Sequence, residues 1–250
     1  MLFRSRAARI PNHLEAETRI NEAVLPPGQG ASATLPTLVS ILPNPDLASE
    51  TLIAYEAGYR LQPQKNIYLD VAAFINVYNG LIVTEDYGAF LETTPAPAHL
   101  TVATWYDNEL RRETHGVEIA PTWQVEDWWK LVGGYTWLRM NLNSNLPAQS
   151  AQQQPGDSPR NQWNLRSSMQ WPHAVTFDTA IYYVDRLTGQ GIPSYLRLDA
   201  RLGWRVSDGL DMSLTGTNLL HELHAEFLPY GAIAPAEIRR TLYAKLTWRF

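Results

Sequence analysis

The chain has 250 residues, a formal net charge of -5 and no cysteine. The lack of cysteine excludes disulfide scaffolds, thiolate metal sites and cysteine nucleophiles. The chain has no basic run and no zinc-ligand spacing, so we expect no nucleic-acid partner. No uninterrupted apolar run approaches the roughly 18 residues that a membrane-spanning helix needs.

The N-terminal segment, residues 1–10, is the first candidate strand and is unlike a secretory signal. A signal carries an apolar stretch of about 7–15 residues after its charges. Here Arg4, Arg6 and Arg9 interrupt the apolar residues. We therefore expect this chain to contain no signal peptide.

Ten segments alternate apolar and polar residues with a period of two, which indicates strands with one apolar and one polar face. In 194–206, for example, Leu196, Leu198 and Leu202 share one face, and Arg197 and Arg201 share the other. A helical period of 3.6 residues is absent. The candidate strands are 1–10, 50–62, 66–80, 112–124, 128–140, 161–171, 174–187, 194–206, 209–219 and 238–250.

The last candidate strand is long for a soluble domain. From Arg239 the sequence reads R-R-T-L-Y-A-K-L-T-W-R-F and ends on Phe250. Strands of soluble proteins usually have about 5–6 residues, whereas about 9–11 tilted residues cross a bilayer. Trp123, Trp129, Trp171 and Trp248 lie near strand ends, so an aromatic girdle at one membrane interface is an alternative to ordinary sheet packing.

The connections alternate in length, as they do in outer-membrane barrels. Short turns are expected near 62–65, 126–127, 172–173 and 207–208, and longer loops at 11–49, 81–111, 141–160, 188–193 and 220–237. We predict an all-β fold of about ten long antiparallel meander strands that form part of a transmembrane β-barrel. A soluble all-β domain is disfavoured, because outward Leu and Trp side chains would aggregate.

Several motifs, in order along the chain, resemble the C-terminal barrel portion of a TonB-dependent outer-membrane receptor. They are S-R-A-A-R-I-P at 5–11, N-P-D-L-A-S-E at 44–50, Y-E-A-G-Y-R at 55–60, F-I-N-V-Y-N-G-L-I at 74–82, H-G-V-E at 115–118, T-N-L-L at 217–220 and the terminal aromatic Phe250. Each motif is weak by itself, but their order and spacing together are specific.

The resemblance implies that residues 1–250 are the last ten or so strands of a barrel with roughly twenty-two. The plug domain and the signal peptide would then be absent from this chain. The parent receptor would lie in the cell outer membrane of a Gram-negative bacterium and take up a ferric siderophore or a similar scarce nutrient. No enzymatic activity and no cofactor are implied.

The resemblance also implies partners. The outer-membrane lipid would cover the apolar faces, the barrel assembly machinery would recognise Phe250, and TonB would act only through the missing plug region. We expect an open half-barrel, with no ladder between residues 1–10 and 238–250. The alternative is a self-contained small outer-membrane barrel that acts as a channel, an adhesin or an enzyme.

Six residues are candidates for contact with a ligand. His221 and His224 lie in an H-E-L-H-A-E run that could suit zinc or iron, but the spacing differs from H-E-x-x-H, and a polar loop is favoured. Arg197 and Arg201 would face the lumen, where they could attract an anion or pair with neighbouring charges and the plug. Trp105 and Tyr106 fall in a predicted long loop. No catalytic or metal site is expected.

Overall fold

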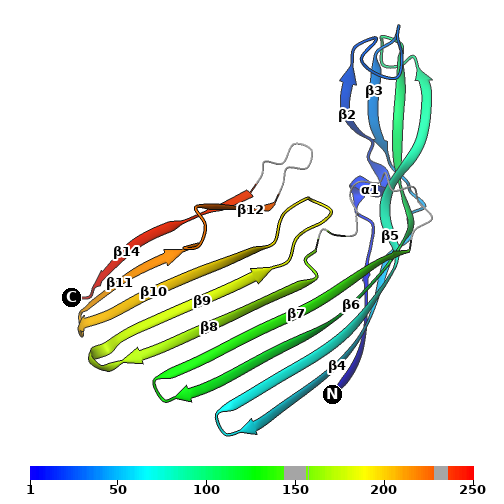
Figure 1. Ribbon diagram of the computed structural model, residues 1–250. Coiled ribbons are helices and arrows are strands. Elements are labelled where there is room, and N and C mark those ends of the chain that lie inside the picture. The colour runs from blue at the N-terminus through cyan, green and yellow to red at the C-terminus, as the bar shows by residue number, and fades with distance from the viewer. Residues whose placement is uncertain (144–155, 157, 228–235) are drawn as a thin grey trace.

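The protein forms one large open sheet of mainly antiparallel strands and a separate two-stranded sheet in a computed structural model that describes residues 1–143, 156, 158–227 and 236–250. Ten strands follow one another in the order β1-β4-β5-β6-β7-β8-β9-β10-β11-β14, and β2 and β3 attach to the side of this path (Figure 1). The ten are β1 (Leu2–Arg9), β4 (Glu50–Gln64), β5 (Ile67–Glu92), β6 (His99–Glu126), β7 (Trp129–Asn143), β8 (Asn161–Trp171), β9 (Val175–Val184), β10 (Tyr195–Ser207), β11 (Leu210–Thr217) and β14 (Thr241–Trp248).

The predicted meander of ten strands is confirmed, and so is the open geometry. Among the described strands, β1 pairs only with β4, and β14 pairs only with β11. No ladder therefore closes the sheet into a small barrel. None of the helices in the described part of the chain is long and apolar enough to span a membrane.

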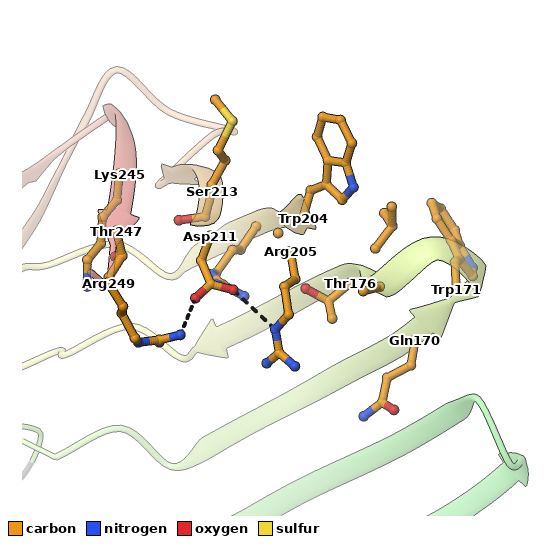
Figure 2. A pocket seen from close by; sticks show the side chains of 15 residues that line it. Gln170, Trp171, Thr176, Trp204, Arg205, Asp211, Ser213, Lys245, Thr247 and Arg249 are labelled. Atoms are coloured by element: carbon orange, nitrogen blue, oxygen red, sulfur yellow. Dashed lines mark hydrogen bonds and ion pairs between the residues drawn. The ribbon is translucent and has the colours of Figure 1, made fainter. Parts of the chain in front are cut away.

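The cross-strand register joins the alternating residues into two continuous faces. Leu202 lies opposite Phe177 on β9 and Leu214 on β11. One residue earlier, Arg201 lies opposite Asp178 and Thr215. Because cross-strand partners lie on the same side of the sheet, the alternation gives the sheet a mainly apolar face and a mainly polar face. In Figure 2, Trp204 and Arg205 point to opposite sides of the sheet.

Tryptophans gather on the apolar face near the short turns. Trp171 precedes the turn η2 (Pro172–Ala174), and Trp204 and Trp248 lie on β10 and β14 close to the turn between β10 and β11. These three are 43%, 49% and 71% exposed. Their arrangement agrees with an aromatic girdle at one edge of a membrane.

The prediction of a loop over 81–111 is wrong. β5 and β6 continue through this segment and stay paired, from the pair Leu81–Leu110 to the pair Glu92–His99. The 11–49 segment also contains α1 (His13–Glu17), β2 (Ile20–Leu25) and β3 (Thr37–Leu42), and β3 runs parallel to β6. These strands form an extension that stands away from the rest of the sheet (Figure 1). Its sequence lacks strict alternation, because no bilayer and lumen impose two opposite faces on it.

Two other connections also differ from expectation. The predicted loop 220–237 contains the small hairpin of β12 (Leu223–Phe227) and β13 (Ala236–Arg239). The predicted strand 238–250 is therefore divided, because Arg240 separates β13 from β14. Most of the predicted loop 141–160 lies outside the described residues.

A bulge marks the start of the extension. The register of β5 shifts between Tyr78 and Leu81, where Gly80 has a φ of +62°. A bulge bends its strand, and glycine accepts this backbone conformation without strain. The Asn108 side chain secures the bend, because its Nδ2 donates to the carbonyls of Gly80 at 2.7 Å and Ala48 at 3.0 Å.

The two faces predict opposite responses to charge at adjacent residues of β8. Leu165 lies on the apolar face opposite Ile181, and Asn164 lies on the polar face opposite Tyr182. An arginine facing hydrocarbon near the midplane costs about 2–4 kcal/mol. We expect Leu165→Arg to lower the folding stability of the whole receptor in lipid vesicles by this amount, measured by urea titration. Asn164→Arg is the matched control, and equal losses for both would contradict two distinct faces.

Candidate functional site

A partly buried polar cluster holds the extension together. Arg19 donates to both carboxylate oxygens of Glu92, at 2.9 and 2.7 Å. The Thr101 hydroxyl donates to the same carboxylate, and Arg19 reaches the Ser40 hydroxyl at 3.3 Å. The guanidinium of Arg19, with help from Thr101, lowers the pKa of Glu92 to about 2. The cluster thus fixes the ends of β5 and β6 against β3.

Trp105 and Tyr106 lie in β6 rather than in a loop. The ring of Trp105 meets Tyr87 edge-on, with centroids 5.7 Å apart, and Tyr87 meets Phe90 at 6.0 Å. Tyr87 is 54% exposed. These rings form an aromatic cluster on the extension in which Tyr87 is exposed and Phe90 and Trp105 are partly buried. Tyr106 is half-buried, and its burial raises the pKa of its phenol.

Three acidic side chains of the extension also lie together. Carboxylate oxygens of Glu85, Asp107 and Glu109 lie within 4.8 Å of one another. Burial, together with repulsion from Glu109 and Asp107, raises the pKa of Glu85. Sequence reasoning did not identify this group, because Glu85 lies on β5 and Asp107 on β6. Acidic groups of this kind are common without an ion.

Arg197 and His224 meet in one network beside the β12–β13 hairpin. Arg197 donates to both oxygens of Asp199, at 3.0 and 2.7 Å, and its guanidinium lies over the Tyr182 ring. Asp199 also accepts from the backbone N–H of Asn218 at 2.9 Å. Asn218 is fully buried with a φ of +52°. Arg197 is therefore held by internal partners.

His224 fastens the hairpin to the sheet. Its ring stacks on Tyr195 of β10 with centroids 4.3 Å apart. Its Nδ1 lies 3.1 Å from Asn218 Oδ1, and its Nε2 lies 3.2 Å from Glu226 Oε1. The side chain is only 7% exposed. Because Asn218 Nδ2 also donates to the Ile238 carbonyl at 2.9 Å, both strands of the hairpin are joined to the sheet.

The remaining two predicted residues lie apart from this network. His221 is exposed, and its ring centroid is 6.5 Å from that of His224. Arg201 lies further along β10 and pairs with Asp178 at 3.4 Å. Sequence reasoning placed Glu226 in the H-E-L-H-A-E run and Tyr195 on the polar face of its strand, but it singled out neither as a site residue. It did single out the T-N-L-L motif that contains Asn218, but could not assign that asparagine a structural role.

Arg201 belongs to a shallow pocket on the polar face near the short turns (Figure 2). Asp211 of β11 lies between two guanidiniums, 3.3 Å from Arg205 Nε and 2.9 Å from Arg249 Nη1. Lys245 and Gln170 complete the polar lining. The pocket could bind a charged group, but no nucleophile in its described lining is hydrogen-bonded to a general base.

The fold and the two-faced sheet agree with a family comparison. A family model described as TonB dependent receptor-like, beta-barrel, matches residues 14–219. The chain belongs to the TonB-dependent receptor family. TonB-dependent receptors lie in the outer membrane of Gram-negative bacteria and are transporters rather than enzymes. Membership confirms the expectation that this chain is not an enzyme.

Solved structures with a similar fold include siderophore receptors. A mutant of the ferric enterobactin receptor PfeA from Pseudomonas aeruginosa matches with a TM-score of 0.70 and 17% identity over 100% of this chain and 38% of that chain. The ferric-catecholate import receptor Fiu from K12 E. coli gives 0.65 and 19% over 100% and 33%. The siderophore receptor PirA from Acinetobacter baumannii gives 0.69 and 15% over 99% and 38%. This chain thus spans well under half of each.

The His224 network predicts how the hairpin is released. Loss of the stacking on Tyr195 and of two hydrogen bonds should cost about 1–3 kcal/mol in His224→Ala. We expect faster trypsin cleavage after Arg239 and Arg240 in the whole receptor, measured by mass spectrometry. His221→Ala is the control, because His221 is exposed. Equal cleavage rates in the two variants would rule out a fastening role for His224.

The Glu92 cluster predicts a dependence of the extension on pH. Because folding lowers the pKa of Glu92 from 4.5 to about 2, the ionised carboxylate stabilises the extension above pH 4.5, and this stabilisation is lost as pH falls toward 2. Glu92→Gln should therefore lower hydrogen-exchange protection of β5 and β6 at pH 7, with a smaller difference near pH 2. Glu22→Gln, an exposed site on β2, should show no such pattern.

Proposed function

We propose that this chain is the C-terminal part of an outer-membrane receptor that takes up a ferric siderophore or a similar scarce nutrient with energy from TonB. The observation that supports this proposal most strongly is the match of the receptor-barrel family model to residues 14–219. The similarity to PfeA, Fiu and PirA, which are receptors of siderophores, supports a ferric siderophore as the ligand class. Their low identity to this chain leaves the choice of siderophore to experiment.

In this proposal the polar face lines a barrel lumen and the apolar face contacts outer-membrane lipid. The outer edges of β1 and β14 carry backbone N–H and C=O groups that lack strand partners among the described residues. Such groups cost several kcal/mol each in hydrocarbon. Further strands of the same protein, outside residues 1–250, would pair with both edges, and a plug domain would supply the contact with TonB.

The extension and the long connections would form the extracellular, ligand-facing surface. The aromatic cluster of Tyr87, Phe90 and Trp105 is suited to an aromatic ligand such as a catecholate. Of the six residues predicted from sequence, Trp105 and His221 are the better placed for a direct contact. Arg197 and His224 would act indirectly, by holding the β12–β13 hairpin in place. Tyr106 and Arg201 lie on β6 and β10 and would not contact the ligand at the extracellular surface.

The opposite end of the sheet would face the periplasm. The short turns and the C-terminus lie at this end, and Phe250 is fully exposed. An exposed terminal aromatic on an edge strand is suited to recognition by the barrel assembly machinery. The ring of Trp248 lies 6.2 Å from that of Phe250 and would be part of the same surface.

Uptake by the whole receptor tests the proposal. We expect it to restore growth in iron-limited medium to a Gram-negative strain that lacks its own siderophore receptors, when a ferric catecholate is supplied. Uptake of labelled iron should disappear when TonB is deleted. Growth without TonB, or failure with catecholate, hydroxamate and mixed siderophores alike, would contradict the proposal.

A pair of tryptophan variants locates the ligand contact. Trp105→Ala should weaken binding of the siderophore about tenfold, which corresponds to roughly 1.4 kcal/mol. Trp204→Ala, on the apolar face, should leave the affinity unchanged. Fluorescence quenching by the ferric siderophore would measure both.

A further inference from the structure

The mainly apolar face of the sheet carries a group of basic side chains on β1, β6 and β7. Cross-strand pairs join one row across five neighbouring strands, namely Arg4, Tyr55, Ile75, His115 and Arg139. Because cross-strand partners lie on the same side of a sheet, Arg4, His115 and Arg139 share the face of Ile75. Basic side chains are unexpected on a face that contacts lipid.

A second row on the same face adds one cation and one carboxylate. Its members are Arg6, Ile53, Val77 and Glu113, again joined by direct cross-strand pairs. Glu113 Oε1 lies 3.6 Å from His115 Nδ1. This carboxylate therefore faces the imidazole of its own strand, and the arginines of the two rows outnumber it.

The three arginines are available to an external partner. Arg4, Arg6 and Arg139 are all exposed, and none of them forms an ion pair with a residue in the described ranges. The guanidinium of Arg4 lies over the ring of Tyr55, 5.8 Å from its centroid. Contact with a ring face leaves the five N–H donors of a guanidinium free.

The position of the rows along the strands places them at one membrane interface. From the short turn, β4 runs from Gln64 to Tyr55 and β7 runs from Trp129 to Arg139, and about 9–11 tilted residues cross a bilayer. Trp163 and Tyr183 stack with centroids 5.8 Å apart toward the same ends of β8 and β9, as in an aromatic belt. Arginine on the lipid face costs most at the midplane and little at an interface.

The chemistry of these rows fits a lipid that carries phosphate. One step closer to the short turns the face becomes apolar, in the row Leu2, Ala57, Ala73, Val117 and Trp137. Apolar residues below cations match an amphiphile with acyl chains and an anionic headgroup. Arginine pairs with phosphate through two parallel hydrogen bonds. Neighbouring strands lie about 4.8 Å apart, so Arg4 and Arg139 can contact separate phosphate groups.

We propose that Arg4, Arg6, His115 and Arg139 form a binding site for the phosphate groups of a membrane lipid in the outer leaflet. This inference rests on the proposed function, in which the apolar face contacts outer-membrane lipid and the extension is extracellular. The site holds the lipid by charge as well as by its acyl chains. It lies on the opposite side of the sheet from the lumen and from the route of a transported ligand.

Native mass spectrometry of the whole receptor in detergent micelles tests the site. We expect phosphatidic acid to remain bound where phosphatidylcholine and diacylglycerol with the same acyl chains dissociate. Inorganic phosphate at millimolar concentration should not displace the phosphatidic acid, because it lacks the chains. Equal retention of the three lipids, or full displacement by inorganic phosphate, would overturn the inference.

Paired variants assign the binding to these side chains. Arg4→Gln combined with Arg139→Gln should weaken retention of phosphatidic acid about thirtyfold, or roughly fivefold for each arginine. Lys130→Gln combined with Arg166→Gln removes the same charge from the polar face of β7 and β8 and should change nothing. Equal losses in the two pairs would rule out a site on the lipid face.

A conservative change keeps the test decisive if the first pair does not fold. Arg139→Lys retains the charge and should retain most of the binding, whereas Arg139→Gln should lose about fivefold. Heat-modifiable migration shows that each variant forms the barrel. The same binding in Arg139→Gln as in the unaltered receptor would exclude Arg139 from the site and overturn the inference.

Iron uptake separates this inference from the proposed function. If the unaltered receptor takes up iron but shows no preference for phosphatidic acid, only the lipid site fails. If it retains phosphatidic acid through Arg4 and Arg139 but takes up no siderophore, the uptake proposal fails and the lipid site stands.

Discussion

The continuous ladder of backbone pairs from β1 to β14 is the constraint on which the rest of the structure depends. In hydrocarbon each backbone N–H and C=O group needs a partner within the protein, so every inner strand must pair on both sides. The same ladder aligns the period-two patterns of neighbouring strands, and a slip of one residue would place arginines among leucines. The two faces and the open edges of the sheet follow from this single register.

Where β5 and β6 extend beyond the membrane-spanning part, the sheet no longer has to separate lipid from lumen. The bulge at Gly80 bends β5 away, and β2 and β3 then pair beside β6. The extension does not lie between lipid and lumen, so it need not have two opposite faces. It has a compact interior that includes the buried residues Val83 and Ala103. The ion pair of Arg19 with Glu92 stabilises this interior across 73 residues of sequence. The extension can therefore hold the aromatic cluster of Tyr87, Phe90 and Trp105 in a fixed position relative to the sheet.

Charge is used differently at the two ends of the polar face. Beside the β12–β13 hairpin, Arg197 and Asp199 satisfy each other, and the neighbouring polar groups hold His224. Near the short turns the ion pairs leave an excess, because Arg205 and Arg249 share one carboxylate. The first arrangement fixes an element of this chain, and the second leaves positive charge on the polar face.

The sequence by itself determined the ten strands and the face on which their side chains lie, because period two is a local property that each strand carries independently. The resemblance to the receptor family came from short motifs in order along the chain, and the family comparison confirmed it. Only the tertiary structure decided the extension, the contact of His224 with Tyr195 and the sharing of Asp211 by Arg205 and Arg249. These depend on pairs between distant strands, such as Thr37 with Leu100, which no local pattern encodes. Arg197 illustrates both: its face was predictable from alternation, but its partners were set by the register.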